Sequence, residues 1–597
     1  MKKIINILLL ASLFIVACND EEFLDRKPHT KSDYSFYTSE DGALQGLNAA
    51  YDVMQQGEKV ERCEFAGTTC SGDAMVGGER GGGDQPSLQE MMKFNTNPAN
   101  IYCFDYWNAM YIGIYRCNLL LDYLKNPIAN FSDELRDRIR GEAFFLRGLY
   151  HFQLQIRYGG FPQLQSTFSD QLKGVPFIDH VLLIDEWKQE RPPLDTTWSR
   201  IEQDFIQAAA LLPLRSVMYA VPENVGRATK GAAQAMLAKT YLYQEKWTQA
   251  YEAAKEAIES NEYYLEGETG HTGPYYITRL SKDVEVSVQV NGFKYIWQPE
   301  ANNCAESIFD HQHQQTGSGR YPEGQEGNLI PQYYNPRRVI AWSVNAATLD
   351  TVLGVSVDVG WGFILPTHYF IETAFKDIGC EDAEGNILDP RFKLSVITPE
   401  DKVPFYYEDE VLRAKYPDSV NIAPYFNNPA TGYVTWKYFT DPYYRNNLGT
   451  LGDHPQNTKY FRFADLLLIG AEAAVKSGHD ADALIWINRV RDRARNCGNT
   501  GYPLPLISVT QEQVWAERRV ELAFEGHQFF DIIRTGRADK IIKQDAMQYP
   551  TSTNAESDAP VQEQFGDNFV IGRNELWPIP QNEIDKTNGN ITQNPNY

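Results

Sequence analysis

Cysteine is scarce in this chain and is not arranged for metal binding or for a disulfide framework. There are 8 cysteines in 597 residues, and no Cys-x-x-Cys pair occurs, which argues against a structural zinc site. Apart from Cys18 they are odd in number and irregularly spaced, so they specify no set of disulfides. Cys63 and Cys70 are close enough in sequence to bridge a loop, but buried free thiols explain them at least as well.

Positive charge is also in deficit. The chain has 55 basic and 79 acidic residues and a formal net charge of −24. Such a chain repels phosphate backbones, so nucleic acid is excluded as a partner. An anionic membrane surface repels it equally, so any attachment to a membrane must be covalent or apolar. Hydrophobic residues at 43% and charged residues at 22% exclude a disordered or collagen-like chain.

Long apolar runs are missing except at the N-terminus. Residues 4–17 are mostly apolar and follow Lys2 and Lys3, which is typical of an export signal. The run is shorter than the roughly 20 residues that a membrane-spanning helix needs. It ends in Ile15-Val16-Ala17-Cys18, which resembles the lipobox of bacterial lipoproteins. We expect a signal peptide at 1–17, lipidation of Cys18 and a lipidated tether at 18–40; the alternative is an ordinary signal peptide cut after Ala17.

Helical periodicity is concentrated in three blocks, at 41–158, 196–260 and 463–537. In the first block, a set of mostly apolar residues recurs at helical spacing on one face: Trp107, Tyr111, Ile114, Cys117, Asn118 and Leu121. Ser132 precedes two acidic residues and suits the start of the next helix, which Gly159-Gly160-Phe161-Pro162 should end. We therefore expect a helical region at 41–260, an irregular, aromatic-rich lobe at 261–460, and a C-terminal helical region at 461–597 in the same globular body.

An internal repeat links the second and third blocks. Ala238 is followed 12 residues later by Ala250, and Ala471 is followed 12 residues later by Ala483. Each unit predicts a helix, a short turn and a second helix, with small residues that allow close approach. This resembles tetratricopeptide repeats without their full consensus, and the alternative is two unrelated helical hairpins. Such units need neighbours to complete a core, so we expect the separated blocks to pack together.

Several motifs follow one another along nearly the whole chain. They are residues 23–28 (FLDRKP), 107–118, 142–152 (EAFFLRGLYHF), 158–162 (YGGFP), 227–230 (RATK), 237–242, 389–391 (DPR), 463–468 (FADLLL), 517–526 (ERRVELAFEG) and 576–580 (LWPIP). In this order they resemble the SusD/RagB family of outer-membrane nutrient-uptake lipoproteins.

The resemblance implies a fold and a function. The implied fold is mostly α-helical, a tetratricopeptide-like right-handed superhelix carrying an irregular ligand-binding lobe rich in loops and short strands. Family members are non-enzymatic cell-surface lipoproteins of the outer membrane. They capture oligosaccharides, or peptides in the RagB branch, and deliver them to a SusC-like TonB-dependent barrel. No cofactor is implied.

A sugar-binding site needs flat aromatic platforms beside side chains that donate and accept hydrogen bonds. A glycine-rich segment at 77–85, which resembles a family loop bordering the ligand, supplies Arg80, Asp84 and Gln85. The alternative for this segment is a mobile surface loop. The lobe supplies the aromatic candidates: Trp297, Tyr321, Tyr334, Trp342 and Trp361. For any single one of them a core position is the better expectation, because aromatic residues are largely buried. The flanking glycines favour exposure of Trp361, and polar, Gly/Pro/Asn-rich surroundings favour exposure of Trp342 and Tyr321. About three stacked rings predict binding weaker than about 1 µM.

Catalytic and metal sites are weaker interpretations. Glu517, Glu521 and Glu525 share a helical face, but neighbouring arginines favour an ion-paired structural helix over a glycosidase pair. His311 and His313 share one face of a predicted strand beside Asp310, without a third ligand at a recognisable spacing. No Gly-x-Ser-x-Gly motif occurs. Bound calcium stays open, although no Asp-x-Asp-x-Asp-Gly loop is present.

Overall fold

The structure is a computed structural model that describes residues 37, 39–77, 84–128, 131–281, 284–314, 327–335, 360–398, 402–404, 419–421, 431–438, 454–548, 552–553, 560–561, 566 and 568–597. The predicted signal peptide, the lipidation residue Cys18 and most of the tether lie outside these residues. So do three of the predicted ligand-binding residues, Arg80, Tyr321 and Trp342.

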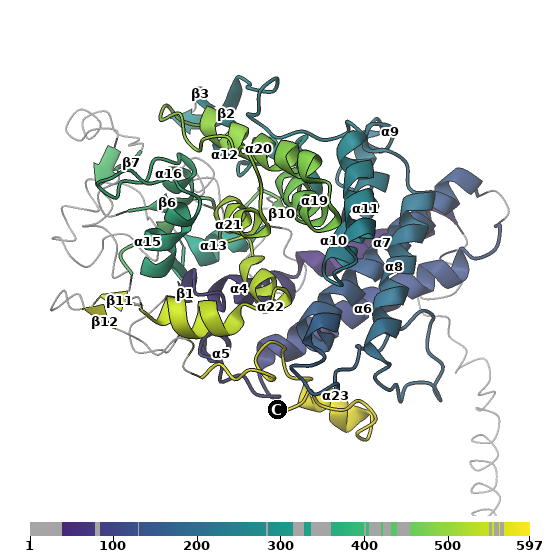
Figure 1. The fold of residues 1–597 in the computed structure, drawn as a ribbon. Helices are drawn as coiled ribbons and strands as arrows, with labels where there is room; N and C mark the ends of the chain where they lie inside the picture. Colours follow the sequence, from purple (N-terminus) through teal and green to yellow (C-terminus); the bar gives the residue numbers. More distant parts are fainter. Residues whose placement is uncertain are drawn as a thin grey trace, which may run out of the picture.

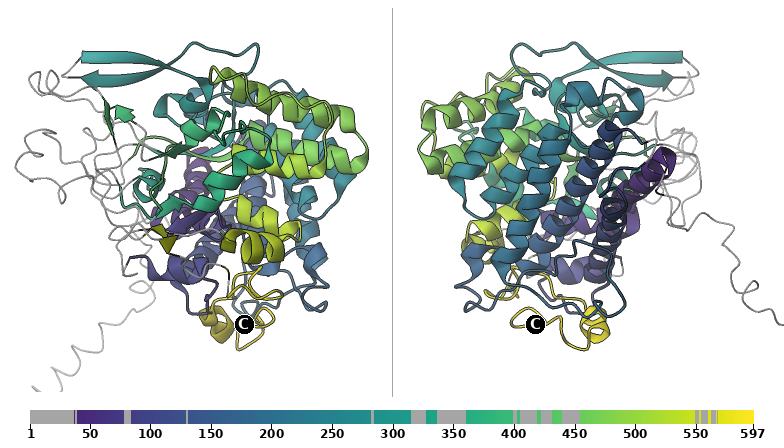
Figure 2. Two further views of the ribbon diagram at one scale, coloured as in Figure 1. Left: turned by 60° about the vertical axis from the view of Figure 1, so that its left-hand side comes forward. Right: turned by 90° about the vertical axis from the view of Figure 1, so that its right-hand side faces the viewer.

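Long helices, each packed on the next, form a frame on one side of the molecule (Figures 1 and 2). They are α3 (Glu40–Asp52), α6 (Ile101–Tyr123), α7 (Asp133–Leu154), α8 (Leu194–Leu211), α10 (Lys230–Leu242), α11 (Trp247–Glu259), α19 (Phe463–Ser477), α20 (Asp480–Asn496) and α21 (Gln511–Glu521). From α6 onward each helix contacts its successor in this order, and α19 also contacts α21. The prediction of a mostly helical, repeat-like fold is confirmed.

The predicted internal repeat consists of two helical hairpins, α10–α11 and α19–α20. Although about 200 residues separate them in sequence, α11 packs directly on α19. The small residues at the expected positions, Ala238, Ala250, Ala471 and Ala483, are all fully buried. The two blocks therefore share one core, as their repeat predicted.

Local sequence explains where these helices begin and end. The Ser132 hydroxyl accepts a hydrogen bond from the Leu135 N–H at the start of α7, and Asn100 and Thr229 cap α6 and α10 in the same way. After α7 the chain widens into one π turn, η4 (Gln155–Gly159), and then turns at Gly160, whose φ is +83°. The predicted end of this helix is thus confirmed, because few residues other than glycine adopt that conformation.

The lobe is built from short helices and two-stranded antiparallel sheets, on the left of Figure 1. The strands are β1 (Ala74–Val76), β2 (Tyr275–Ser281), β3 (Val284–Val290), β4 (Ser307–His311), β5 (Ile364–Pro366), β6 (Val396–Ile397), β7 (Lys402–Pro404), β8 (Ser419–Asn421), β9 (Val434–Thr435), β10 (Thr458–Arg462), β11 (Ser552–Thr553) and β12 (Pro560–Val561). They pair as β1–β5, β2–β3, β4–β10, β6–β9, β7–β8 and β11–β12.

The remaining helices are short. They are α4 (Arg62–Thr69), α5 (Pro86–Met92), α9 (Arg215–Met218), α12 (Gly292–Tyr295), α13 (Ile330–Tyr334), α15 (His368–Asp377), α16 (Arg391–Ser395), α22 (Gln528–Arg534) and α23 (Gln581–Lys586), with π or 3-10 turns η2 (Val53–Gln55), η3 (Gly57–Glu61), η5 (Pro162–Leu164), η6 (Pro222–Asn224), η7 (Pro299–Ala301), η9 (Asp539–Asp545) and η10 (Ala546–Gln548).

Two features tie the lobe to the frame. Strand β10 runs directly into α19 and pairs with β4. Strand β1 comes from the N-terminal region yet pairs with β5 of the lobe. The region expected to be helical therefore contributes one strand to the lobe.

The cysteines of the described part are free thiols. Cys63 and Cys70 lie on α4 and just after it, and both are buried without forming the bridge that their spacing allowed. Burial raises the pKa of the Cys70 thiol to about 12, so it stays protonated.

Candidate functional site

The structure brings several of the predicted ligand-binding segments together at one place, which we call the β1–β5 edge: residues 74–77, 333–335 and 360–366. The pairing of β1 with β5 is extended by a hydrogen bond of 2.8 Å from the Gly77 N–H to the Phe363 carbonyl. On the other side, the N–H of Trp361 donates to the Gln332 carbonyl at 2.7 Å and that of Gly362 to the Asn335 carbonyl at 2.8 Å.

Glycines make this close packing of backbone possible. A Cβ atom on Gly77 would lie 2.2 Å from the Gly362 carbonyl oxygen, and one on Gly360 would lie 2.4 Å from the Asn335 carbonyl oxygen. Gly362 itself has a φ of +63°. The glycines around Trp361, which predicted exposure, therefore also serve close backbone contact.

The segments that contain Arg80 and Trp342 leave the described part at this edge. The described residues end at Gly77 and resume at Asp84; they end again at Asn335 and resume at Gly360. Asp84 and Gln85 are half-buried at the start of α5, where the Gln85 side-chain oxygen accepts a hydrogen bond from the Tyr102 hydroxyl. Gly77, the last described residue before the predicted loop, thus lies beside Gly362 and Phe363 of the Trp361 segment, although the two are far apart in sequence.

The described aromatic candidates belong to one chain of ring contacts that runs inward from the edge. Trp361 lies edge-on to Tyr333 at 5.1 Å between ring centroids, and Tyr333 lies 4.5 Å from Phe65 of α4. The series continues from Phe65 to Tyr334 at 5.4 Å, from Tyr334 to Tyr438 at 4.5 Å, and from Tyr438 to Trp297 at 5.4 Å.

Only Trp361 of these candidates is partly exposed, and the expectation that Trp297 and Tyr334 present open faces to a ligand is wrong. Trp297 is 6% exposed, with the cationic groups of Lys437 and Arg462 over its ring. Tyr334 is 2% exposed, and its hydroxyl donates to the Phe524 carbonyl at 2.7 Å. Their partners come from distant segments, so local polarity could not reveal this burial. Tyr333, another aromatic residue that the sequence offers in the lobe, is 1% exposed and lies edge-on to Trp361.

The carboxylates of the rival catalytic interpretation are fully committed to ion pairs. Glu517 contacts Arg391 at 2.7 Å and Arg491 at 2.6 Å. Glu521 forms ion pairs with three guanidinium groups, those of Arg391, Arg462 and Arg493. Burial alone would raise the pKa of the Glu521 carboxyl, but these cations outweigh it and hold that pKa well below its ordinary value. A general acid needs a raised pKa, which Glu521 lacks. Glu517 and Glu521 thus lie on an ion-paired structural helix, as the sequence favoured, whereas Glu525 lies beyond the end of α21 and not on the predicted helical face.

The histidine pair lies in the core. His313 Nε2 is 2.8 Å from a Glu61 carboxylate oxygen, and Asp310 pairs with Lys459 at 2.8 Å. Among the described residues, no group of three or more His, Cys, Asp or Glu side chains is arranged to hold a metal ion.

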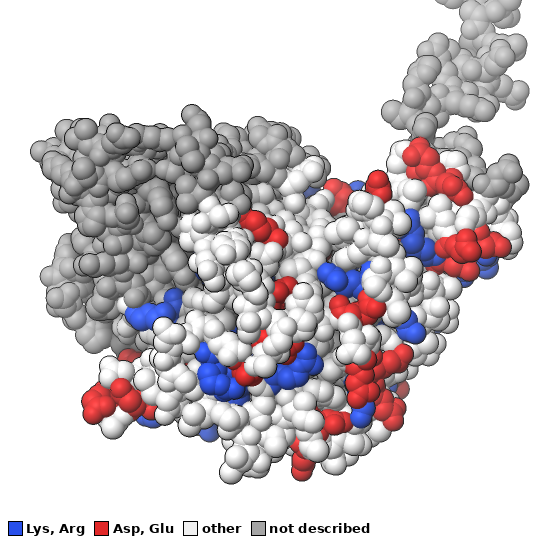
Figure 3. Space-filling model, turned by 90° about the horizontal axis from the view of Figure 1, so that it is seen from above, with Lys and Arg blue, Asp and Glu red and all other residues white. Residues whose placement is uncertain are grey.

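Surface charge is mixed on the face that Figure 3 shows. Over its described part, acidic and basic side chains lie side by side, without a continuous basic surface. None of the described helices has both the length and the apolar composition that crossing a bilayer requires.

Frame, lobe and edge together define a helical-repeat protein with an appended lobe. A sequence model described as "SusD family" matches residues 306–597, and one described as "Starch-binding associating with outer membrane" matches residues 22–242. Because the two matches together cover most of the chain, the protein belongs to the SusD/RagB family.

Individual relatives agree with this assignment. The SusD-like protein P38 of Formosa agariphila is 25% identical over 91% of this chain and 94% of its own length. A structure described as a laminarin-binding SusD-like protein is 25% identical, covers 93% of this chain and 99% of its own, and superposes with a TM-score of 0.65. A SusD-like protein from Bacteroides fragilis, 21% identical over 95% of this chain and 99% of its own, has the same fold with a TM-score of 0.68.

Proposed function

We propose that this protein is a cell-surface lipoprotein of the outer membrane that binds a neutral oligosaccharide and delivers it unchanged to a SusC-like TonB-dependent barrel. The observation that carries the binding site is the β1–β5 edge. There, Gly77 and Asn335, which precede the segments containing Arg80 and Trp342, are hydrogen-bonded to Phe363 and Gly362, the residues that follow the partly exposed Trp361. An indole fixed by backbone hydrogen bonds and by Tyr333 suits stacking on the apolar face of a sugar.

The class of ligand is supported by the laminarin-binding relative, which shares 25% of its sequence with this chain over nearly its whole length. A β-glucan oligosaccharide is therefore the first ligand to test. The absence of catalysis in this proposal is supported by Glu517, Glu521 and Glu525, each of which is paired with arginine or lysine.

Calorimetry on the protein lacking residues 1–18 tests ligand binding, with laminarin, malto-, cello- and xylo-oligosaccharides and a peptide mixture as probes. We expect a dissociation constant above about 1 µM for one of the glycans. Trp361→Ala should weaken binding about tenfold, the equivalent of one lost stacked ring. Trp187→Ala is the matched control, because Trp187 is an exposed tryptophan, 45% accessible, on another loop.

Each alternative has its own outcome in these experiments. Binding of peptides but of no glycan would favour the RagB-type function, and shortening of the glycan in chromatography would reveal an enzyme. Equal affinity of the Trp361→Ala and Trp187→Ala variants would remove the β1–β5 edge as the site.

The membrane part of the proposal is tested in cells. Cys18→Ala should abolish incorporation of labelled palmitate and release the protein from the outer-membrane fraction. Unchanged labelling would contradict lipidation at Cys18. Copurification tests the proposed partner. We expect a barrel protein to copurify with the wild-type protein from detergent-solubilised outer membrane.

A further inference from the structure

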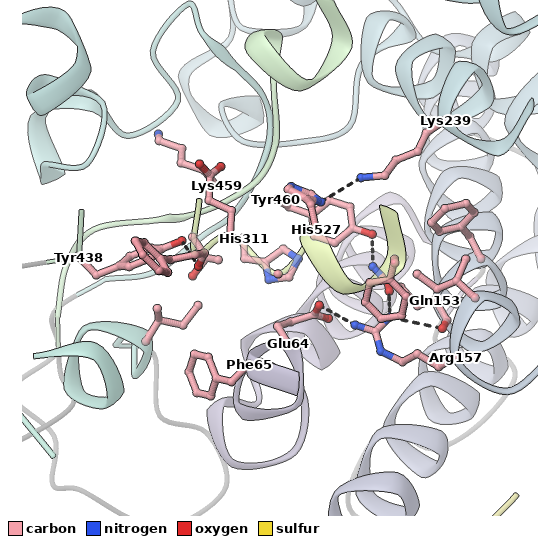
Figure 4. Close-up of a pocket in the computed structure, with 18 of the residues that line it drawn as sticks. Glu64, Phe65, Gln153, Arg157, Lys239, His311, Tyr438, Lys459, Tyr460 and His527 are labelled. Atoms are coloured by element: carbon pink, nitrogen blue, oxygen red, sulfur yellow. Dashed lines mark hydrogen bonds and ion pairs between the residues drawn. The ribbon is translucent and has the colours of Figure 1, made fainter. Parts of the chain in front are cut away.

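A small, partly open cavity lies where the lobe meets the frame. It has a volume of about 60 Å³, and its lining comes from α4, α7 and η4 on the frame side and from β4 and β10 on the lobe side. Figure 4 shows Glu64, Gln153, Arg157, His311 and Tyr460 converging on it. Phenylalanine and tyrosine rings fill much of the remaining wall.

His311 is the most unusual group in this cavity. His311 is 3% exposed, and its ring stacks on the ring of Tyr460 with centroids 5.1 Å apart. Among the described residues, neither Nδ1 nor Nε2 finds a hydrogen-bond partner. Burial lowers the pKa of His311 to about 3, so the ring is neutral and carries one N–H donor and one acceptor nitrogen. Leaving both unpaired would be costly, because each buried polar group must then lose its hydration.

Arg157 adds a second unpaired donor to the same cavity. Its Nη2 group pairs with Glu64 at 2.6 Å, and its Nη1 group donates to the side-chain oxygen of Gln153. Its Nε–H group is buried and has no acceptor in the part of the chain that the structure describes. Residues that carry unpaired polar groups, one on each side of the joint between lobe and frame, therefore line the same cavity.

Size and charge decide what can occupy that space. A water molecule has a share of liquid volume of about 30 Å³, so the cavity has room for about two, and it is far smaller than the ~150 Å³ cavity that admits benzene. A sugar ring is thus too large. The charged groups around the cavity are paired, Lys239 with Asp465 at 3.1 Å and Lys459 with Asp310 at 2.8 Å. No unpaired charge is left there to select an ion.

We propose that this cavity is a hydration site that holds about two ordered water molecules bound to both nitrogens of His311 and to Nε of Arg157. Water both donates and accepts, which matches this set of groups. Through these water molecules, His311 of β4 is hydrogen-bonded to Arg157 of the frame, a connection that no described side chain makes directly. Water reaches the cavity past Glu64, whose side chain is 24% exposed.

Crystals of the protein lacking residues 1–18 test the proposal directly. We expect ordered density within 2.7–3.2 Å of the His311 nitrogens and of Arg157 Nε, and no xenon in the cavity after pressurisation. Xenon bound there, or a cavity without ordered density, would overturn the proposal. This arm needs only the wild-type protein.

The variant His311→Phe tests the proposal in solution. The substitution keeps a ring on Tyr460 but removes the donor and the acceptor. If water satisfies His311, the variant has a lower melting temperature and loses the signal of about two long-lived waters in magnetic relaxation dispersion. If the cavity is dry, removing two unpaired groups raises the melting temperature, and the dispersion is unchanged. His271→Phe is the matched control, because His271 stacks on Tyr264 at 3.7 Å but is exposed.

Discussion

At the scale of single residues, buried arginine–carboxylate pairs hold the C-terminal region together. Glu521 is fully buried and contacts three arginines that come from α16, β10 and α20. A buried ion pair contributes modestly when intact, but removing one partner leaves the others desolvated and uncompensated.

We therefore predict that Glu521→Gln destabilises the protein strongly. The variant keeps the shape of the side chain but leaves the arginine cluster with excess positive charge. The free energy of unfolding should fall by about 3–5 kcal/mol, measured by urea denaturation followed by circular dichroism. Glu512→Gln is the control on the same helix, because Glu512 is exposed, and its effect should stay within about 0.5 kcal/mol. Similar effects of the two variants would contradict the structural role of Glu521.

His151 gives the stability a pH dependence of known sign. Burial, with a further contribution from the charge of Arg147, lowers the pKa of His151 to about 3. Among the smaller effects, the charge of Asp179 raises this pKa and that of Arg200 lowers it. The ring is held neutral, and its Nε2 accepts the Ile178 N–H at 3.1 Å. The unfolded chain binds a proton near pH 6.5, whereas the folded protein binds it only near pH 3. Stability from this group is thus present above pH 6.5 and is lost as the pH falls.

We predict that His151→Gln flattens the acid side of the stability profile. Below about pH 6, one such histidine contributes a slope of about 1.4 kcal/mol per pH unit, which the variant should lack in urea titrations at pH 7, 6, 5 and 4. His180 behaves in the opposite way, because hydrogen bonds to Asp179 and Glu186 raise its pKa. His180→Gln should therefore steepen the acid loss. Parallel profiles for the wild type and His151→Gln would refute the assignment.

At the scale of elements, sequence predicted the frame well because its signals are local. The buried face of α6 follows from apolar residues three and four apart, and the caps at Ser132 and Asn100 lie within three residues of the groups they bind. The aromatic candidates of the lobe depend instead on distant partners. Tyr438 and Arg462 cover Trp297, and Phe65 covers Tyr334. The residues next to Trp297 and Tyr334 in sequence do not identify these distant partners. Residue type alone could not separate a core ring from a platform.

The junction of the two hairpins is an element-scale feature with little spare room. Gly470 of α19 faces Trp486 of α20 and Ile258 of α11, and an added Cβ would lie 2.9 Å from the Trp486 ring and 3.2 Å from Ile258. We predict that Gly470→Val lowers the free energy of unfolding by about 1–3 kcal/mol through overpacking, measured by urea denaturation. Ala481→Val, at an exposed position of α20, should cost only about 0.5 kcal/mol.

A second substitution separates overpacking from other causes. Trp486→Phe removes the ring atoms that crowd position 470, so Gly470→Val should cost less in that background than in the wild type. Strictly additive effects of the two substitutions would contradict a direct clash between positions 470 and 486.

At the scale of the whole molecule, the two ends of the chain complete one another. The buried alanine face of α11 rests on α19, which follows it by about 200 residues, and β1 of the N-terminal region pairs with β5 of the lobe. A helical unit that lacks its neighbour exposes its apolar face to water, which costs about 25 cal/mol for each Å². The apparent division into an N-terminal and a C-terminal region therefore does not mark two independent folding units.

This interdependence predicts that the fragment 19–260 does not fold cooperatively alone. Without α19, the buried surface around Ala250, Ala254 and Ala257 would be exposed. We expect a broad thermal transition by circular dichroism and strong binding of a hydrophobic dye, whereas coexpression with the fragment 261–597 should restore a single sharp transition and a stable complex. If the fragment 19–260 melted alone with the cooperativity and midpoint of the full chain, the shared core would not be what holds the two halves together.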